Sequence, residues 1–134
     1  DNAITLLKAL VNALLARAKE TVNYIMPGFT HLRKAQPINC AQYFNAYSEM
    51  FLRDLDRFHA LKKRMNVMPL GSAALAGTSW PIDREVTREL LGFDSISQNS
   101  LDAVSDRDFV AEYLFCASLA MRGGVIFTHT LGTV

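Results

Sequence analysis

Apolar side chains recur every three or four residues along the first part of the chain, and this period constrains the fold more than any other feature. The recurring positions are Ile4, Leu7, Val11, Leu14, Ala18, Val22 and Ile25. Such steps place side chains along one face of an α-helix. Leu6, Leu10 and Leu15 widen that face beyond what one partner helix would cover. We therefore predict a helix that packs among several others and ends near Met26, because Pro27 cannot continue the hydrogen-bond ladder.

A second long helix is predicted over residues 40–66. Its apolar side contains Phe44, Phe51, Leu55, Phe58 and Met65. The charged side, which we expect to be solvated or to bridge to neighbours, contains Arg53, Asp54, Asp56, Arg57, Lys63 and Arg64. Long helices with wide apolar faces are typical of helical bundles. The predicted fold class is therefore all-α, a bundle of long helices.

Shorter signals mark the remaining elements. Asp83 is predicted to cap a helix over residues 84–91, which Gly92 ends. Ser105, three residues before Asp108, is predicted to cap a third long helix. We expect that helix to end at residues 123–124, a pair of glycines, because residues 125–134 are β-branched and typical of a strand. The chain thus divides into a helical-bundle fragment, residues 1–122, and an atypical tail, residues 123–134.

Composition argues against several classes of partner. The chain carries 14 Lys and Arg against 13 Asp and Glu, a net charge of +1, without a basic run. This balance favours neither nucleic acid nor a membrane surface as a partner. We find no apolar run that we expect to span a bilayer and no signal peptide, so we predict a cytoplasmic protein. Cys40 and Cys116 lack metal-ligand or redox spacing, so we predict buried or half-buried thiols and neither a metal nor a cofactor.

Two polar segments interrupt the helical pattern. Residues 27–37 are expected to form a turn-rich connection, since Pro37 restricts Gln36 to an extended conformation. This segment sets Thr30 beside His31, whose imidazole can take or give a proton near neutral pH. Residues 94–108 are dense in serine and aspartate and include Arg107. From the residues alone, capping and packing remain alternatives to a functional role for both segments.

Three motifs resemble the argininosuccinate lyase family of the fumarase/aspartase superfamily, which also includes adenylosuccinate lyase and the delta crystallins. The first is Pro-Gly-Phe-Thr-His-Leu-x-x-Ala-Gln-Pro at residues 27–37. The second is Pro-Leu-Gly-Ser-Ala-Ala-Leu-Ala-Gly-Thr at 69–78, and the third is Asn-Ser-Leu-Asp-Ala-Val-Ser-Asp-Arg-Asp-Phe at 99–109. Ile82-Asp83-Arg84-Glu85 strengthens the likeness, which runs from Asp1 to about Met121.

The resemblance implies a homotetramer built on a central helical bundle, with active sites where three subunits meet. The implied reaction eliminates fumarate from argininosuccinate and releases arginine, the last step of arginine biosynthesis. It needs a base, donors for carboxylate charge and an acid for the departing nitrogen. By resemblance His31 is the acid–base group or orients the succinyl part of the substrate, and Thr30 binds substrate. The other implied substrate-binding residues are Asn99, Ser100 and Arg107, and the supporting residues are Gln36, Asp102, Ser105 and Asp108.

The sequence also departs from the family pattern. Arg33 stands where the family commonly has Gln. A family loop of the form Ser-Ser-x-Met-Pro-x-Lys-x-Asn does not occur in these residues, and it is thought to supply a serine for proton transfer. We therefore expect the chain by itself to be inactive. The alternatives are a non-catalytic, crystallin-like oligomerisation module, or a lyase acting on another succinyl substrate such as adenylosuccinate.

Overall fold

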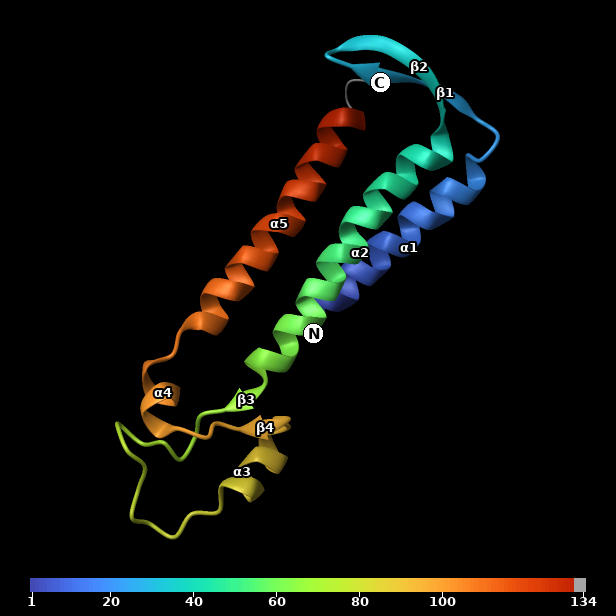
Figure 1. Ribbon diagram of the computed structural model, residues 1–134. Coiled ribbons are helices and arrows are strands. Elements are labelled where there is room, and N and C mark those ends of the chain that lie inside the picture. The colour runs from blue at the N-terminus through green and yellow to red at the C-terminus, as the bar shows by residue number, and fades with distance from the viewer. Residues whose placement is uncertain (132–134) are drawn as a thin grey trace. The chain divides into compact units, whose positions relative to one another are not determined.

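The computed structural model describes residues 1–131, in which five helices and two small sheets alternate along the chain (Figure 1). The helices are α1 (Asn2–Glu20), α2 (Cys40–Met65), α3 (Arg84–Leu91), α4 (Ser100–Ser105) and α5 (Asp108–Leu131). The strands are β1 (Ile25–Thr30), β2 (Arg33–Asn39), β3 (Val67–Met68) and β4 (Ser95–Ile96). The predicted all-α bundle class is confirmed. The described chain forms two compact units, one of residues 1–58 together with residues 116–131, the other of residues 59–115.

Helix α1 follows the predicted apolar period but ends earlier than expected. Its buried residues are Ile4, Val11, Leu14 and Ala18. The helix stops at Glu20, where the Thr21 hydroxyl donates a 2.8 Å hydrogen bond to the Arg17 carbonyl oxygen. Val22 and Ile25 lie beyond the helix and are exposed, so the predicted end near Met26 is wrong. The Thr21 hydroxyl thus takes up a carbonyl oxygen that a further helical turn would use, and this favours ending the helix here.

The core of the first unit lies among α1, α2 and α5. Val11 and Leu14 of α1 form a buried cluster with Tyr47 and Phe51 of α2, and Phe127 of α5 packs against it. The ring centroids of Tyr47 and Phe127 lie 4.9 Å apart, edge to face. Aromatic pairs in this arrangement stabilise a core beyond the area that they bury. On the predicted apolar side of the second helix, Phe51 and Phe58 are buried and Phe44 packs against the cluster, whereas Met65 is exposed. The predicted range of 40–66 is confirmed within one residue.

Helix α5 continues through the segment for which a strand was predicted. The helix runs to Leu131, so the predicted end at residues 123–124 is wrong, and so is the strand-like structure predicted for residues 125–131. Residues 132–134 lie outside the described part of the chain. A Cβ added at Gly123 would lie 3.3 Å from the Phe51 ring, so a small residue suits this close approach. The Thr130 hydroxyl lies 2.7 Å from both the Tyr43 and the Tyr47 hydroxyl oxygens. These tertiary contacts outweigh the local β-propensity.

Two further expectations concern charge and membrane length. Asp54 lies on the side of its helix that was expected to be solvated or to bridge to neighbours. It is only 4% exposed and pairs with Arg57 at 2.7 Å, so it bridges to a neighbour and is not solvated. Among the described residues, one helical stretch, 108–128 of α5, is long and apolar enough to cross a membrane by length and composition. The expectation that no run is long enough is therefore wrong. A helix packed in a bundle meets the same criterion, so length and composition do not decide between the two environments.

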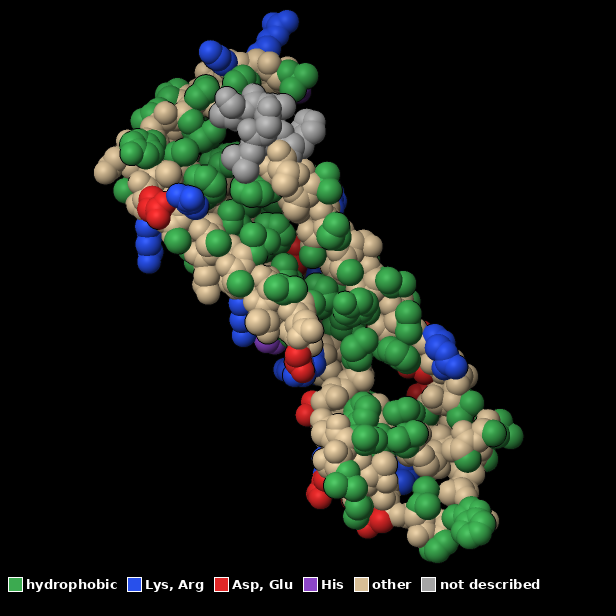
Figure 2. Space-filling model, turned by 180° about the vertical axis from the view of Figure 1, so that it is seen from behind, with side chains coloured by type: hydrophobic (Ala, Val, Ile, Leu, Met, Phe, Trp, Pro, Cys, Tyr) green, Lys and Arg blue, Asp and Glu red, His purple; other side chains and the backbone are tan. Residues whose placement is uncertain are grey.

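Large apolar side chains remain at the surface of the chain, as the green areas of Figure 2 show. On α5 they include Val110, Tyr113, Leu114, Phe115, Met121 and Val125. Helix α5 therefore exposes large apolar side chains that the described chain itself does not cover.

The second unit is organised by a short parallel strand pair. Met68 of β3 lies opposite Ile96 of β4 and is fully buried. Helix α3 begins as predicted, because one Asp83 carboxylate oxygen accepts hydrogen bonds from the backbone N–H groups of Glu85 and Val86. It ends as predicted at Gly92, whose φ of 73° is left-handed. Local capping rules thus place α3 correctly.

The predicted cap of the third long helix is one residue out. Ser105 is the last residue of α4, and its hydroxyl donates to the Leu101 carbonyl oxygen at 2.9 Å. Asp106 takes the expected role, since its carboxylate accepts from the Asp108 backbone N–H at 2.7 Å. The prediction for Ser105 is wrong because its hydroxyl is already engaged in the preceding helix.

The pair formed by Arg64 and Glu112 joins α2 to α5 within the second unit. The Arg64 guanidinium donates to both Glu112 carboxylate oxygens, and these hydrogen bonds lower the pKa of Glu112 below its ordinary value of 4.5. A lowered folded-state pKa stabilises the fold above the unfolded pKa, and this contribution is lost as the pH falls through the folded-state value. We expect Glu112→Gln to lower the urea midpoint of unfolding at pH 7. Below pH 4.5 the midpoints of the variant and the unmodified chain should move closer together, because the ion pair is lost in the unmodified chain as well. Urea titrations between pH 3 and 7 measure this; a constant difference would contradict it.

Candidate active site

The first motif forms a β-hairpin whose tip presents Thr30 and His31. Strands β1 and β2 pair antiparallel, with Thr30 opposite Arg33. The prediction of a turn-rich connection missed these strands, and the chain reverses at His31 and Leu32. Gln36 lies in β2, so its predicted extended conformation is confirmed. Gly28 is required because a Cβ there would lie 2.8 Å from the Gln36 carbonyl oxygen. The paired strands therefore fix the hairpin from which the two predicted site residues project.

The backbone at the tip is strained. His31 has φ of 51° and Leu32 has φ of 62°, both in the left-handed region. A two-residue hairpin turn of type I′ needs positive φ at both central positions and usually uses Asn, Asp or Gly. Histidine is enriched in this region, whereas a bulky residue such as Leu32 is an outlier there. Strained tips of this kind cluster at functional sites, so the conformation supports a functional role for the tip.

We expect Leu32→Asn to stabilise the first unit by about 0.5–1 kcal/mol, because asparagine adopts positive φ at lower cost than leucine. The Leu32 side chain is 93% exposed, so the substitution removes little packing. The free energy of unfolding from urea titration measures the effect. Leu75→Asn is the matched control, since Leu75 is also exposed but is not among the left-handed residues. An equal gain in both variants would contradict strain at the tip.

A hollow of about 710 Å³ lies against the hairpin. Thr30 and Gln36 both line it, together with Tyr43 of α2. Burial is the largest cause of the raised pKa of Tyr43, so its phenol stays protonated and can donate or accept a hydrogen bond. His31 is exposed at the tip, and the residues that line the hollow do not include it. The first motif thus combines an accessible imidazole with a neighbouring hollow whose lining is mostly apolar.

The second group of predicted site residues lies together in the second unit. The Asn99 side-chain oxygen caps α4 by accepting from the backbone N–H groups of Leu101 and Asp102 at 2.9 and 3.1 Å. Ser100 is the first residue of α4, and Asp102 lies exposed in its first turn. Because its oxygen is engaged in the cap, the Asn99 amide group can offer its N–H donors to a carboxylate. Asn99 therefore serves the helix and remains suited to bind an anionic substrate.

Arg107 follows α4 and is exposed. Its guanidinium donates to the carbonyl oxygens of Val104, at 3.2 Å, and Asp106, so the side chain lies back over its own turn. The guanidinium has five N–H donors, so these bonds leave capacity for a carboxylate. Asp108 begins α5. One hairpin thus carries Thr30, His31 and Gln36. One short segment of the other unit carries Asn99, Ser100, Asp102, Ser105 and Arg107. That both groups serve one active site stays a prediction.

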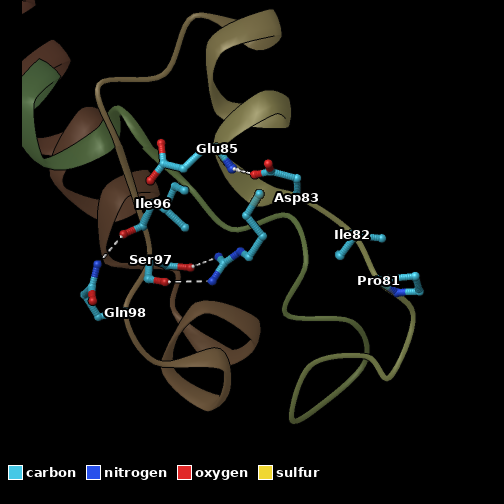
Figure 3. Close-up of a pocket in the computed structure, with 8 residues that line it drawn as sticks. Pro81, Ile82, Asp83, Glu85, Ile96, Ser97 and Gln98 are labelled. Carbon is cyan, nitrogen blue, oxygen red and sulfur yellow. Dashed lines mark hydrogen bonds between the residues drawn. The ribbon is translucent and has the colours of Figure 1, made fainter.

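Arg84 makes contacts that no sequence pattern predicted. Its guanidinium donates to the Ser97 carbonyl oxygen at 3.2 Å and to the Ser97 hydroxyl at 3.0 Å, beside a hollow of about 570 Å³ drawn in Figure 3. The resemblance to the family included Arg84 only as part of residues 82–85. Arg84 and Ser97 lie in different elements, so helical or strand periodicity could not predict their contact. Within the described residues, no group of three or more His, Cys, Asp or Glu side chains is arranged to hold a metal ion.

Comparison with known proteins places the chain in a family. A family model described as lyase matches residues 1–123. The chain belongs to this lyase family. The family is part of the fumarase/aspartase superfamily, which the three motifs had indicated.

Relatives of this chain carry a more specific name. Argininosuccinate lyase from Desulforamulus reducens is 58% identical over 116 residues, covering 87% of this chain and 25% of the relative. Argininosuccinate lyase from Acinetobacter baumannii is 55% identical over 121 residues, covering 90% of this chain and 25% of the relative. The chain thus spans about a quarter of the length of the curated relatives that it matches.

Solved structures agree with the lyase fold. EDDS lyase in complex with formate superposes with a TM-score of 0.94 at 34% identity, over 98% of this chain and 26% of that chain. A variant of EDDS lyase with bound fumarate gives the same values. The predicted fold, part of a long-helix domain of the fumarase/aspartase type, is confirmed.

Proposed function

We propose that this chain is part of an argininosuccinate lyase, which eliminates fumarate from argininosuccinate and releases arginine, the last step of arginine biosynthesis. The observation that carries the proposal is the 58% identity to a named argininosuccinate lyase over 116 residues. The substrate is a small molecule with several carboxylates, and it suits a site that combines an accessible imidazole with amide and guanidinium donors.

In this proposal the residues of the two motifs divide the chemistry between them. His31 acts as the acid–base group or orients the succinyl part, and Thr30 beside it binds substrate. Asn99 and Ser100 donate hydrogen bonds to a substrate carboxylate, and the Arg107 guanidinium binds a carboxylate through a forked pair of hydrogen bonds. Gln36, Asp102, Ser105 and Asp108 support these groups. The exposure of both motifs supports this assignment, because a substrate can reach them.

The proposal extends to assembly and location. The exposed apolar surface of α5 is covered by other copies of the protein in a homotetramer, in which different subunits contribute the two motifs to one site. The large exposed side chains of α5 support this assembly over a solvated helix. The proposed location is the cytoplasm.

A chimaera tests the proposed activity. The 116 matching residues of this chain replace their counterparts in the Desulforamulus reducens enzyme, and fumarate release from argininosuccinate is measured against the unmodified enzyme. We expect turnover within about tenfold of that enzyme. A folded chimaera without turnover would favour the non-catalytic, crystallin-like alternative. Turnover with adenylosuccinate instead would favour the alternative substrate. The 134-residue chain alone is expected to release no fumarate, because it supplies about a quarter of the relatives' length.

A further inference from the structure

We propose that Arg84 is a positioning residue that clamps the loop at residues 69–78 to the segment carrying Asn99 and Ser100, and so holds these substrate-binding residues in place. The inference rests on the proposed function and deepens it by adding a residue that acts through others. All of the contacts that carry it lie within the second unit.

The clamp consists of three hydrogen bonds from one guanidinium. Its Nε donates to the Leu70 carbonyl oxygen at 2.9 Å, and its two Nη atoms donate to the carbonyl and hydroxyl oxygens of Ser97, as the dashed lines at Ser97 in Figure 3 show. Leu70 and Ser97 belong to segments far apart in the sequence. The rigid fork of arginine can bond both segments at once, which the single ammonium of lysine does with less geometric control.

The loop is closely fitted around the Arg84 side chain. Gly71 has φ of 92°, and a Cβ added there would lie 2.8 Å from Arg84 Cδ and Nε. Any other residue at this position would displace the guanidinium or the loop. The Gly77 backbone N–H donates to the Ser72 carbonyl oxygen at 2.8 Å and closes the loop on itself. Glycine at position 71 therefore has a structural reason, which is to let the backbone approach the Arg84 side chain closely.

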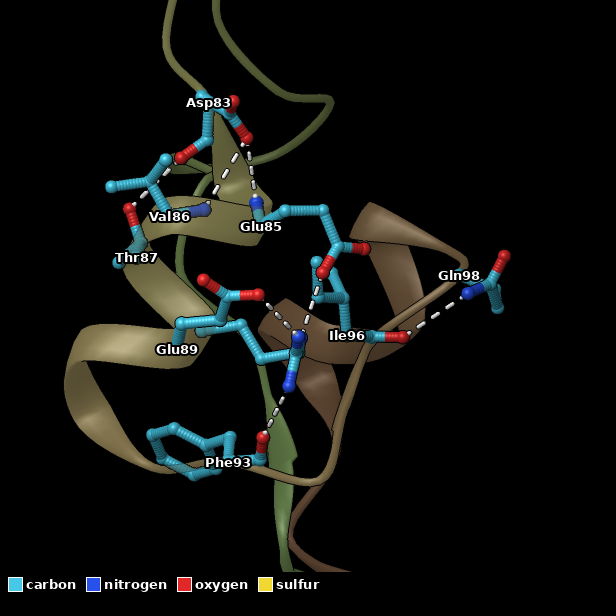
Figure 4. Close-up of polar contacts among 9 residues, drawn as sticks. Asp83, Glu85, Val86, Thr87, Glu89, Phe93, Ile96 and Gln98 are labelled. Atoms are coloured by element: carbon cyan, nitrogen blue, oxygen red, sulfur yellow. Dashed lines mark hydrogen bonds and ion pairs between the residues drawn. The ribbon is translucent and has the colours of Figure 1, made fainter.

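On the other side, Ser97 connects the clamp to the predicted site. The Ser97 backbone N–H donates to the Met68 carbonyl oxygen at 3.0 Å, which extends the pairing of β3 with β4. Asn99 follows two residues later and caps α4 with its side chain. A shift of Ser97 would therefore move the Asn99 cap and the start of α4. The Asp83 cap of α3 fixes the backbone from which Arg84 projects (Figure 4).

Kinetics of the chimaera test the clamp. We expect Arg84→Gln to raise KM for argininosuccinate about 10- to 100-fold while kcat falls less than tenfold, because substrate-binding residues lose their position and His31 does not. The KM of the Arg84→Lys variant should lie between those of the unmodified chimaera and the Arg84→Gln variant. Arg88→Gln is the matched control, since Arg88 is on the same helix and bonds Glu85, Glu89 and the Phe93 carbonyl oxygen instead (Figure 4). Added guanidinium ion should partly restore KM in Arg84→Ala. Equal effects of the Arg84 and Arg88 variants, or no rise in KM, would overturn the proposal.

Hydrogen exchange separates failure of the clamp from failure of the proposed function. In the 134-residue chain, Arg84→Gln and Arg84→Lys should speed exchange of the Ser97, Leu101 and Asp102 amides at least tenfold, and Arg88→Gln should leave them unchanged. If the chimaera shows no lyase activity but these amides respond, the proposed function fails and the clamp stands. If activity is present and the amides do not respond, the clamp is wrong.

Discussion

Replacing His31 by asparagine in the chimaera is expected to lower kcat about 100- to 10,000-fold, the range that a positioned acid–base group contributes. Asparagine cannot exchange a proton near neutral pH, yet it tolerates the left-handed backbone of the hairpin tip, where His31 has φ of 51°. The hairpin should therefore persist, and the loss should reflect chemistry. Fumarate release at saturating argininosuccinate measures kcat, and the thermal midpoint checks that the fold is kept.

His59→Asn provides the matched control for this prediction. His59 is exposed on α2, in the other unit from the hairpin, and has no proposed role in the site. We expect its substitution to change kcat less than twofold. If His31→Asn leaves kcat within threefold while the fold is intact, His31 has no part in the proton transfers. If KM alone rises, His31 orients the succinyl part of the substrate, which was the alternative role.

The largest effect on stability is expected at Phe51, whose replacement by alanine should lower the free energy of unfolding by about 3–5 kcal/mol. Phe51 is 2% exposed and belongs to the cluster with Val11, Leu14 and Tyr47. Its ring also packs against α5 at Gly123, so truncation would leave a cavity facing three helices. A rigid cavity of this kind costs more than the transfer of the lost atoms.

Urea titration of the 134-residue chain at two protein concentrations measures the effect of Phe51→Ala. Leu52→Ala is the control, because Leu52 is the next residue on α2 and its side chain is 40% exposed. It should cost less than about 1 kcal/mol, as substitutions outside the core usually do. Similar losses in the two variants would show that Phe51 does not lie at the centre of a packed core.

Local rules predicted the elements whose boundaries are set by their own residues. The apolar period found α1 and α2, and capping rules found α3 from Asp83 to Gly92. These rules work because a helix satisfies its hydrogen bonds within a few residues. The same rules failed at Ser105. Its hydroxyl was expected to cap the following helix, but it donates a hydrogen bond to the Leu101 carbonyl oxygen within α4.

Long-range contacts explain the remaining errors. The hairpin at residues 25–39 was missed because its strands are short, contain two prolines and lack an alternating apolar pattern. The helical end of α5 was missed because Gly123 and Thr130 are poor helix formers, and their contacts with Phe51, Tyr43 and Tyr47 become visible only in the folded chain. Propensity is a weak prior when tertiary packing opposes it.

The candidate site was predictable mainly through the motifs. Spacing alone left Thr30 and His31 as a hydroxyl and an imidazole in a turn, with packing as an alternative. The structure adds the strained tip, the Asn99 cap and the position of Arg107 over its own turn. It also adds Arg84, whose contact with Ser97 could not be found by periodicity because loops connect the two residues.

The hairpin also bears on the solubility of the protein. A ribbon of two strands has two outer edges, and an unprotected edge is a template on which another chain can add a strand and start an aggregate. In this ribbon Pro27 lies directly opposite Pro37. Neither residue has a backbone N–H, so both edges are interrupted at the same level. The two prolines therefore let a strained, exposed tip extend into solvent while the strands that carry it resist pairing with strands of other molecules.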